Sequence, residues 1–124
     1  MIERRKYRRV KDGVRVIYKV LGVNGETRMC ALDVAAGGLR LPVKEKIKPG
    51  TLLELGLSLP QDKEPFFCLT RVVWQADEVK RDKDGKDYYE TGIEFVRIDI
   101  RQRMRLIHYV YPLLRKQRNE TGQL

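Results

Sequence analysis

Apolar and polar residues alternate with period two along most of the chain. Between Val14 and Val20, for example, every second residue is apolar and Arg15 and Lys19 stand between them. This alternation is typical of strands with one buried face and one face in water. Six segments show the pattern or a close variant of it: 14–20, 27–32, 39–43, 53–59, 66–76 and 89–95. In the fifth segment, Trp74 falls on the predicted inward face and Thr70 stands at the odd position among its apolar neighbours.

The connections between these segments contain residues that favour turns. Asn24-Gly25 predicts a hairpin with a type I′ turn, in which both central residues take positive φ. Asp33 to Gly38 predicts a loop with paired glycines, and 81–87 a charged hairpin loop. We therefore expect neighbouring strands to pair in an antiparallel manner.

After Phe95 the period changes from two to between three and four. The apolar residues Ile100, Met104, Ile107, Tyr111 and Leu114 form one stripe of an amphipathic helix, which we expect to pack on the sheet. Asp99 is positioned to cap the start of this helix. Pro112 removes an internal hydrogen bond, so the helix is expected to kink or end near Val110.

Six strands followed by one helix predict an all-β domain with a C-terminal helix, built as a six-stranded antiparallel barrel. The chain divides into a basic N-terminal arm at 1–13, the barrel with its helix at 14–118, and a frayed tail at 119–124. The length of 124 residues suits one domain. No apolar stretch reaches the ~20 residues of a membrane span, and the start lacks the apolar core of a secretory signal, so we expect a cytoplasmic protein.

Charge supplies the first functional clue. The net charge is +9, and six of the 26 Lys and Arg residues lie within the first twelve positions. Such a balance indicates an anionic partner. Cys30 and Cys68 are expected to be reduced thiols rather than a disulfide, as in a cytoplasmic protein.

The candidate residues for catalysis are few. His108 is the single histidine and lies in the predicted helix, with no nucleophile arranged near it in the sequence. No pair of carboxylates stands in an apolar context that would raise a pKa, and no CxxC pair supports a metal site. The sequence therefore predicts no enzyme, no metal and no cofactor.

Two short motifs are candidates for binding. Arg5 and Arg9 have Arg-x-x-x-Arg spacing, and guanidinium groups match phosphate oxygens and the O6 and N7 edge of guanine. Asp33 can accept the N1–H and N2–H₂ donors of a guanine, and a following glycine allows close approach of the backbone. Each motif alone also fits a simpler interpretation, namely a solvated charge run and an ordinary turn.

Together, in this order, the two motifs resemble the signature of the PilZ family of bacterial cyclic di-GMP receptors. That signature is Arg-x-x-x-Arg followed by Asp/Asn-x-Ser-x-x-Gly, read here as Arg5 to Arg9 and Asp33 to Gly38. Leu39-Arg40-Leu41, 71–74 and Gly92 to Phe95 followed by a helix extend the resemblance over nearly the whole chain. The resemblance implies a six-stranded barrel with a C-terminal helix and cyclic di-GMP as the ligand.

The resemblance also implies roles for single residues. Arg5 and Arg9 would clamp the phosphate and guanine of cyclic di-GMP. Arg4, just before the motif, implies a stacked pair of ligands, two per chain. Because the arm has little apolar surface to offset the entropy of ordering, we expect it to be mobile in the free protein and ordered by the ligand.

In the second motif, Asp33 would hydrogen-bond a guanine edge and Gly38 would shape the loop. Ala35 occupies the position of the motif's serine. Loss of one neutral hydroxyl contact costs about 0.5–1.5 kcal/mol, so the resemblance implies weakened rather than abolished binding.

The expected function is therefore a receptor or adaptor domain that binds cyclic di-GMP, moves its arm and signals to a protein partner that the sequence does not identify. One alternative is a degenerate PilZ-like domain that binds only protein. The other is a small basic barrel that binds nucleic acid; it rests on charge alone, because the strands lack a row of exposed aromatic residues for base stacking.

Overall fold

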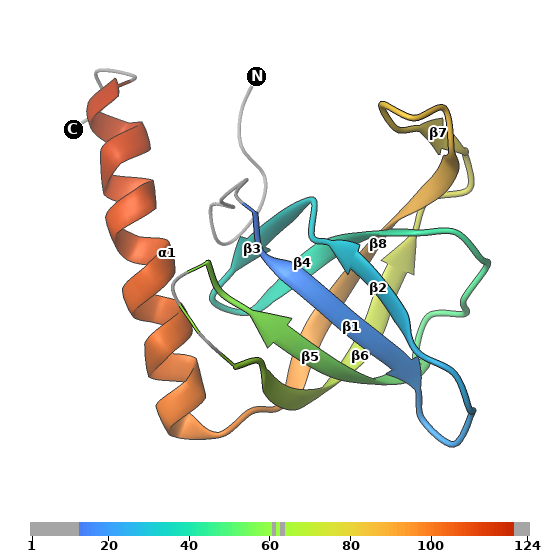
Figure 1. Ribbon diagram of the computed structural model, residues 1–124, viewed down its shortest axis with the longest axis horizontal. Coiled ribbons are helices and arrows are strands. Elements are labelled where there is room, and N and C mark those ends of the chain that lie inside the picture. The colour runs from blue at the N-terminus through green and yellow to red at the C-terminus, as the bar shows by residue number, and fades with distance from the viewer. Residues whose placement is uncertain (1–12, 61, 63, 121–124) are drawn as a thin grey trace.

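The computed structural model describes residues 13–60, 62 and 64–120, with side chains described as far as residue 115 except that of Leu114. It contains eight strands and one helix (Figure 1). The elements are β1 (Arg15–Val20), β2 (Thr27–Cys30), β3 (Asp33–Ala35), β4 (Gly38–Val43), β5 (Leu52–Ser58), β6 (Phe66–Gln75), β7 (Lys80–Arg81), β8 (Asp87–Arg97) and α1 (Ile100–Glu120). The predicted arm, apart from Gly13, lies outside the described residues, as do positions 121–124 of the predicted tail.

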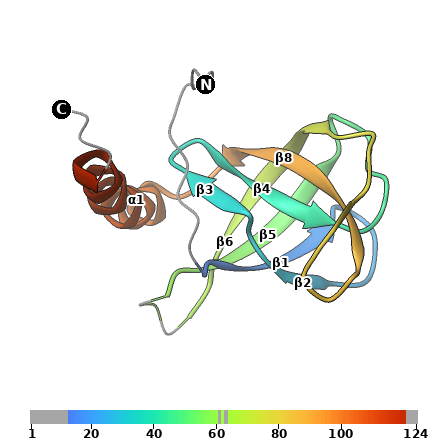
Figure 2. The ribbon, with the colours of Figure 1, turned by 90° about the horizontal axis from the view of Figure 1, so that it is seen from above.

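The strands form one antiparallel sheet in the order β2-β1-β5-β6-β8-β4-β3, with β7 paired to β8 beside this path. The sheet curls into a half-barrel, and α1 lies alongside it (Figures 1 and 2). This confirms the predicted class, a β fold with a C-terminal helix. The short strands β3 and β7 are additions to the six that the sequence predicts.

The concave side of the sheet holds the core. Apolar side chains at alternate positions of β1, β4 and β5 meet there, and Leu106 and Val110 of α1 join them. Tyr18 lies among them with its hydroxyl donating to Glu45 Oε1 at 3.0 Å. Burial, reinforced by that carboxylate, raises the pKa of Tyr18 to about 12. Thr70 is also on the inward face, where its hydroxyl donates to the carbonyl of Leu53 at 3.0 Å.

The first hairpin is present but its turn differs from the prediction. Residues 21–26 connect β1 to β2, and positive φ occurs at Gly22 and Gly25. Asn24 does not take positive φ, so the type I′ turn is wrong. The longer connection spreads the reversal over two glycines that each tolerate the left-handed region.

Strand β6 departs from regular pairing, and this reverses the prediction for Trp74. Val72 pairs with Ile93 and Trp74 pairs with Gly92, so Val73 is an extra residue on β6. Such a bulge changes which side of the sheet the following residues face. Trp74 is partly exposed on the convex side, and its ring lies where a Cβ of Gly92 would be.

A second aromatic residue of β6 covers a glycine in the same way. Phe67 pairs with Gly56 of β5, and a Cβ added to Gly56 would come within 2.7 Å of the Phe67 ring. Glycine leaves the surface of a strand without a side chain, and the neighbouring aromatic ring covers that gap. Strand β6 thus places one ring on each of its two neighbours.

Helix α1 starts as predicted and continues further than predicted. Asp99 Oδ1 accepts a hydrogen bond from the Arg101 N–H at 2.9 Å, which is an N-cap contact. Pro112 does not end the helix, which runs to Glu120. Pro112 has no N–H to donate to the carbonyl of His108. Both residues lie on the exposed side of the helix, where water can hydrogen-bond that carbonyl instead. Of the helices in the described part of the chain, none is long and apolar enough to cross a membrane.

The predicted packing stripe of α1 is wrong. Leu106 and Val110 are buried, and Tyr109 and Leu113 pack against the core beside them. Ile100, Met104 and Tyr111 of the predicted stripe are instead exposed. The helix has apolar residues on more than one side, and periodicity alone does not say which side the sheet covers.

Candidate functional site

A tight hairpin takes the place of the predicted loop at residues 33–38. Asp33 to Ala35 form β3, Gly38 begins β4, and Ala36-Gly37 make the turn between them. Asp33 pairs with Arg40 and Ala35 with Gly38. The loop prediction is wrong because it gave weight to the glycines and missed the alternation of 33–35.

The hairpin brings three of the predicted site residues onto one face. Val34 and Leu39 belong to the core, so Asp33, Ala35 and Gly38 lie on the opposite, convex side of the sheet. All three are buried there. The other predicted ligand-binding residues, Arg4, Arg5 and Arg9, lie outside the described residues.

An arginine that the sequence did not single out as a site residue holds this face together. Arg40 Nε donates to Asp33 Oδ2 at 2.7 Å, and Nη2 of the same guanidinium lies 2.6 Å from that oxygen. Its Nη1 donates to Glu90 Oε2 of β8 at 2.8 Å. The Asp33 side chain is 1% exposed and that of Arg40 is 14% exposed, so this is a largely buried ion pair.

The charges in this network stabilise one another. Burial opposes the charge of Arg40, but its hydrogen bonds and ion pairs with Asp33 and Glu90 outweigh burial and raise the pKa of Arg40. Lys80 donates a hydrogen bond to Glu90, and that bond chiefly lowers the pKa of Glu90. The network therefore connects β3, β4, β7 and β8.

Gly38 has a structural role that differs from the predicted one. A Cβ at this position would lie 2.1 Å from the carbonyl oxygen of Ile93 in β8. Backbone atoms cannot yield as a flexible side chain can, so this position excludes larger residues. Gly38 therefore permits close contact between β4 and β8 rather than shaping a loop.

The same face continues across β8 to β6. Arg40 pairs with Gly92, and Gly92 pairs with Trp74. Three strand spacings separate Asp33 from Trp74, or about 14 Å at ~4.8 Å each. Trp74 is the single tryptophan of the chain. Next to it, Arg71 and Glu94 form an ion pair that is about half exposed. The face thus combines a buried charge network with an accessible aromatic ring.

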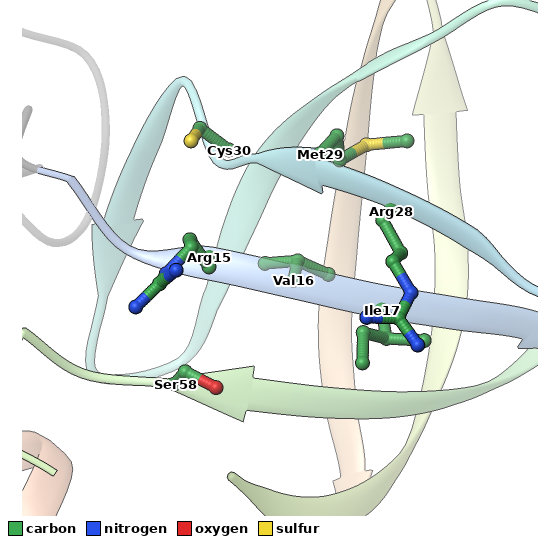
Figure 3. A pocket seen from close by; sticks show the side chains of 7 residues that line it. All are labelled: Arg15, Val16, Ile17, Arg28, Met29, Cys30 and Ser58. Atoms are coloured by element: carbon green, nitrogen blue, oxygen red, sulfur yellow. The ribbon is translucent and has the colours of Figure 1, made fainter. Parts of the chain in front are cut away.

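A separate pocket lies on the outer side of β1, β2 and β5 (Figure 3). Its volume is about 370 Å³, and Arg15, Arg28 and Ile17 are among the residues that line it. Arg15 pairs with Cys30 on one side and with Ser58 on the other. This pocket was not predictable from the sequence, since Arg15, Ile17 and Arg28 occupy ordinary outward positions of strands.

The groups considered for other chemistry lie apart from one another. Cys30 is exposed and Cys68 is half-buried, and both are free thiols. Burial raises the pKa of Cys68 to about 12. His108 is exposed on α1 near Asp62 and Arg105. Within the described residues, no three His, Cys, Asp or Glu side chains gather as a metal site would require.

The half-barrel with a C-terminal helix matches a PilZ-like fold. The sequence model of the PilZ domain matches residues 3–111, and the chain belongs to the PilZ family. PilZ domains are binding and adaptor domains. The match includes Arg4, Arg5 and Arg9 as well as the hairpin. Among curated protein sequences, none matches this chain.

Solved structures of PilZ proteins share the fold. The PilZ domain of YcgR from Escherichia coli, solved with c-di-GMP, is 15% identical with a TM-score of 0.66, covering 98% of this chain and 100% of that one. The MrkH–c-di-GMP complex from K. pneumonia is 16% identical with a TM-score of 0.74 (96% and 55% covered). Bacillus subtilis MotI/DgrA, an inhibitor of motility, is 22% identical with a TM-score of 0.64 (95% and 53% covered). The chain thus spans about half of MrkH and of MotI.

Proposed function

We propose that this chain is a bacterial, cytoplasmic receptor for cyclic di-GMP that performs no catalysis. The observation that carries the proposal is the β3–β4 hairpin, which places Asp33, Ala35 and Gly38 on one face of a PilZ domain. The c-di-GMP complexes of YcgR and MrkH, which share the fold, support it. The net charge of +9 suits a ligand with two phosphates.

In this proposal the ligand lies on the convex face, between the hairpin and the arm. Arg5 and Arg9 bind phosphate and guanine as planar, charged donors. Asp33 accepts from a guanine edge, and Arg40 holds its carboxylate in place through two close contacts to Oδ2. Arg40 therefore contributes to affinity by holding Asp33 in place, without touching the ligand itself.

The presence of Arg4 before the motif leads us to propose two stacked cyclic di-GMP molecules per chain. Isothermal titration calorimetry measures this number directly. A saturating ratio of two supports the proposal, and a ratio of one refutes the stoichiometry while leaving the site intact.

Titration of variants tests the site itself. Arg5→Ala and Arg9→Ala each remove a charged contact worth about 1.5–3 kcal/mol, or roughly ten- to hundredfold in affinity. Arg28→Ala is the matched control, because it removes the same charge from an exposed position of β2. Equal effects of all three substitutions would show only a general electrostatic attraction and would refute the site.

Ala35 offers a test of the second motif. Ala35→Ser restores the hydroxyl of the family signature and should tighten binding by about 0.5–1.5 kcal/mol. Because Ala35 is buried, the stability of the variant must be measured alongside its affinity. Weaker binding by a variant of unchanged stability would contradict this account of the alanine.

Trp74 provides an independent signal. It lies on the same face, about 14 Å from Asp33 along the row of paired residues. We expect cyclic di-GMP to change tryptophan fluorescence with the same affinity that calorimetry gives. An unchanged spectrum at saturation would place the ligand away from this face.

The last part of the proposal concerns signalling. The ligand orders the arm on the barrel, and the new surface is read by a protein partner, a disorder-to-order switch. Amide hydrogen exchange of residues 1–11 should slow on addition of cyclic di-GMP, and unchanged exchange would exclude this switch.

Binding of a random oligonucleotide but not of cyclic di-GMP at physiological salt would favour the nucleic-acid alternative. Binding of neither would favour a domain that contacts only protein.

A further inference from the structure

Helix α1 exposes an apolar stripe that no part of the described barrel covers. Ile100 is 74% exposed, Met104 45% and Tyr111 57%, with the half-buried Ile107 between the last two. The spacing of four, three and four residues places these side chains on one side of the helix. Exposed apolar residues scattered singly are ordinary, whereas a continuous stripe on one helix indicates a contact surface.

The stripe lies on a different side of α1 from the residues that contact the core. Leu106 and Val110 are the α1 residues that reach the core. At 100° per residue, the centre of their side lies roughly 110° from the centre of the stripe around the axis. Figure 2, which views the molecule from above, shows α1 at its edge with the outer side of the helix clear of every strand. The helix can therefore contact the barrel and an external surface at the same time.

Within α1 the charges beside the stripe are positive from 100 to 119, and the exposed Asp99 lies just before them. Residues 100–119 contain no Asp or Glu, and Arg101 and Arg115 are exposed at its border. Neither of these arginines forms an ion pair with any part of the chain that the structure describes. Arg105, by contrast, is tied to the barrel through Asp62 at 2.5 Å. Arginines that form no ion pair within the described residues, at the border of an apolar stripe, suit an anionic surface.

The positive charge of residues 100–119 helps to identify the kind of surface that α1 binds. A second copy of the same helix would bring like charges together, which disfavours a helix pair. Helices that pair specifically use charges of both signs to set their register. A bilayer with anionic lipids requires no register, since it presents a uniform negative charge over an apolar interior. Basic amphipathic helices bind such interfaces with their apolar side inserted among the headgroups.

We propose that α1 is a docking surface for anionic lipid bilayers, with Ile100, Met104, Ile107 and Tyr111 inserted and Arg101 and Arg115 on the headgroups. This surface is separate from the β3–β4 hairpin and needs no cyclic di-GMP. Membrane binding and ligand binding can therefore succeed or fail independently in experiment.

Co-sedimentation of the full chain with vesicles tests the proposal. Vesicles of phosphatidylcholine containing phosphatidylglycerol should bind the protein, and vesicles of phosphatidylcholine alone should not. Met104→Asp should weaken binding by about tenfold or more, because it places a charge in the inserted stripe. Val79→Asp is the control with matched exposure, since Val79 is 46% exposed on the barrel.

The role of charge requires its own pair of variants. Arg101→Glu with Arg115→Glu should lower binding by about tenfold or more. Arg28→Glu with Arg81→Glu changes net charge equally at exposed positions of β2 and β7 and should have a much smaller effect. Thermal unfolding of every variant shows whether it is folded before its binding is compared.

Loss of vesicle binding in the α1 variants alone supports the proposal. It is overturned if the folded wild-type chain ignores anionic vesicles, or if the barrel variants lose binding equally. It is also overturned if analytical ultracentrifugation finds a dimer that Met104→Asp dissociates, because a second copy then covers the stripe. Binding of a designed acidic amphipathic peptide without binding of vesicles would assign the helix to a protein partner and overturn it as well.

Discussion

Replacing Arg40 by methionine removes the charge that Asp33 and Glu90 share while keeping most of the apolar stem of the side chain. Asp33 is 1% exposed, so its carboxylate would lose a charged partner without gaining free access to water. Glu90 would still have Lys80. Asp33 is the more buried of the two carboxylates, at 1% against 17% exposed, so we expect the main cost there.

The magnitude follows from the burial of the pair. Removing one partner of a buried ion pair typically costs 3–5 kcal/mol, because the other charge remains buried. Arg40 itself is 14% exposed, which places the expected loss near the lower limit, at about 3 kcal/mol. A domain of this size has a free energy of unfolding of roughly 5–15 kcal/mol, so the variant should fold with much reduced stability.

Urea denaturation followed by circular dichroism measures this loss. The matched control is Arg71→Met, which breaks an ion pair with Glu94 on the same face. That pair is 48% and 42% exposed, and exposed pairs contribute about 0–1 kcal/mol. The two substitutions are chemically identical, so their difference isolates the effect of burial.

The double variant Asp33→Asn with Arg40→Met completes the cycle. The asparagine carries no charge that needs Arg40. The loss of stability in the double variant should therefore be smaller than the sum of the losses in the two single variants by about 1 kcal/mol or more. Equal losses in Arg40→Met and Arg71→Met, or strict additivity in the double variant, would refute the view that a buried ion pair stabilises the hairpin.

Three further predictions concern other parts of the molecule. Gly38→Ala should destabilise the ligand-free protein by about 1–3 kcal/mol through overpacking. Gly13→Ala is the control and should change stability little, because nothing lies within 4 Å of the added Cβ. Urea denaturation measures the stability of both variants. An aromatic disulfide reagent should modify the exposed Cys30 quickly and Cys68 only on unfolding, because burial raises the Cys68 pKa to about 12. Lys80 lowers the pKa of Glu90, so the stability that the Glu90 charge contributes is present above the ordinary pKa of a glutamate and is lost as the pH falls from about 5. Glu90→Gln should flatten this part of the curve of stability against pH. An unchanged curve would contradict a stabilising role for the Glu90 charge.

Regular alternation made most strands predictable. Leu53, Leu55 and Leu57 are all buried as their spacing indicates, and Asp99 caps the helix as its position before the apolar stripe indicates. These features depend on local pattern. Local pattern also sufficed for the fold class, because short strands joined by turn residues leave few arrangements.

Features that depend on contacts between distant residues were not predictable. The pair of Arg40 with Glu90 joins positions 50 apart and requires the register of β4 on β8. The bulge at Val73 arises from pairing with β8 and turns Trp74 outward, which simple alternation cannot reveal. The orientation of α1 likewise depends on which of its apolar sides meets the sheet.

The two rings of β6 have a consequence for how the sequence can change over time. Phe67 covers Gly56 and Trp74 covers Gly92, so each glycine and its aromatic partner form one unit of packing across neighbouring strands. A larger residue at either glycine collides with the aromatic ring unless a smaller residue replaces the aromatic one. A smaller residue in place of the aromatic one, with the glycine kept, leaves the strand surface uncovered. Among related chains, each pair should therefore be inherited or replaced together, so that these two pairings appear as correlated substitutions across the family.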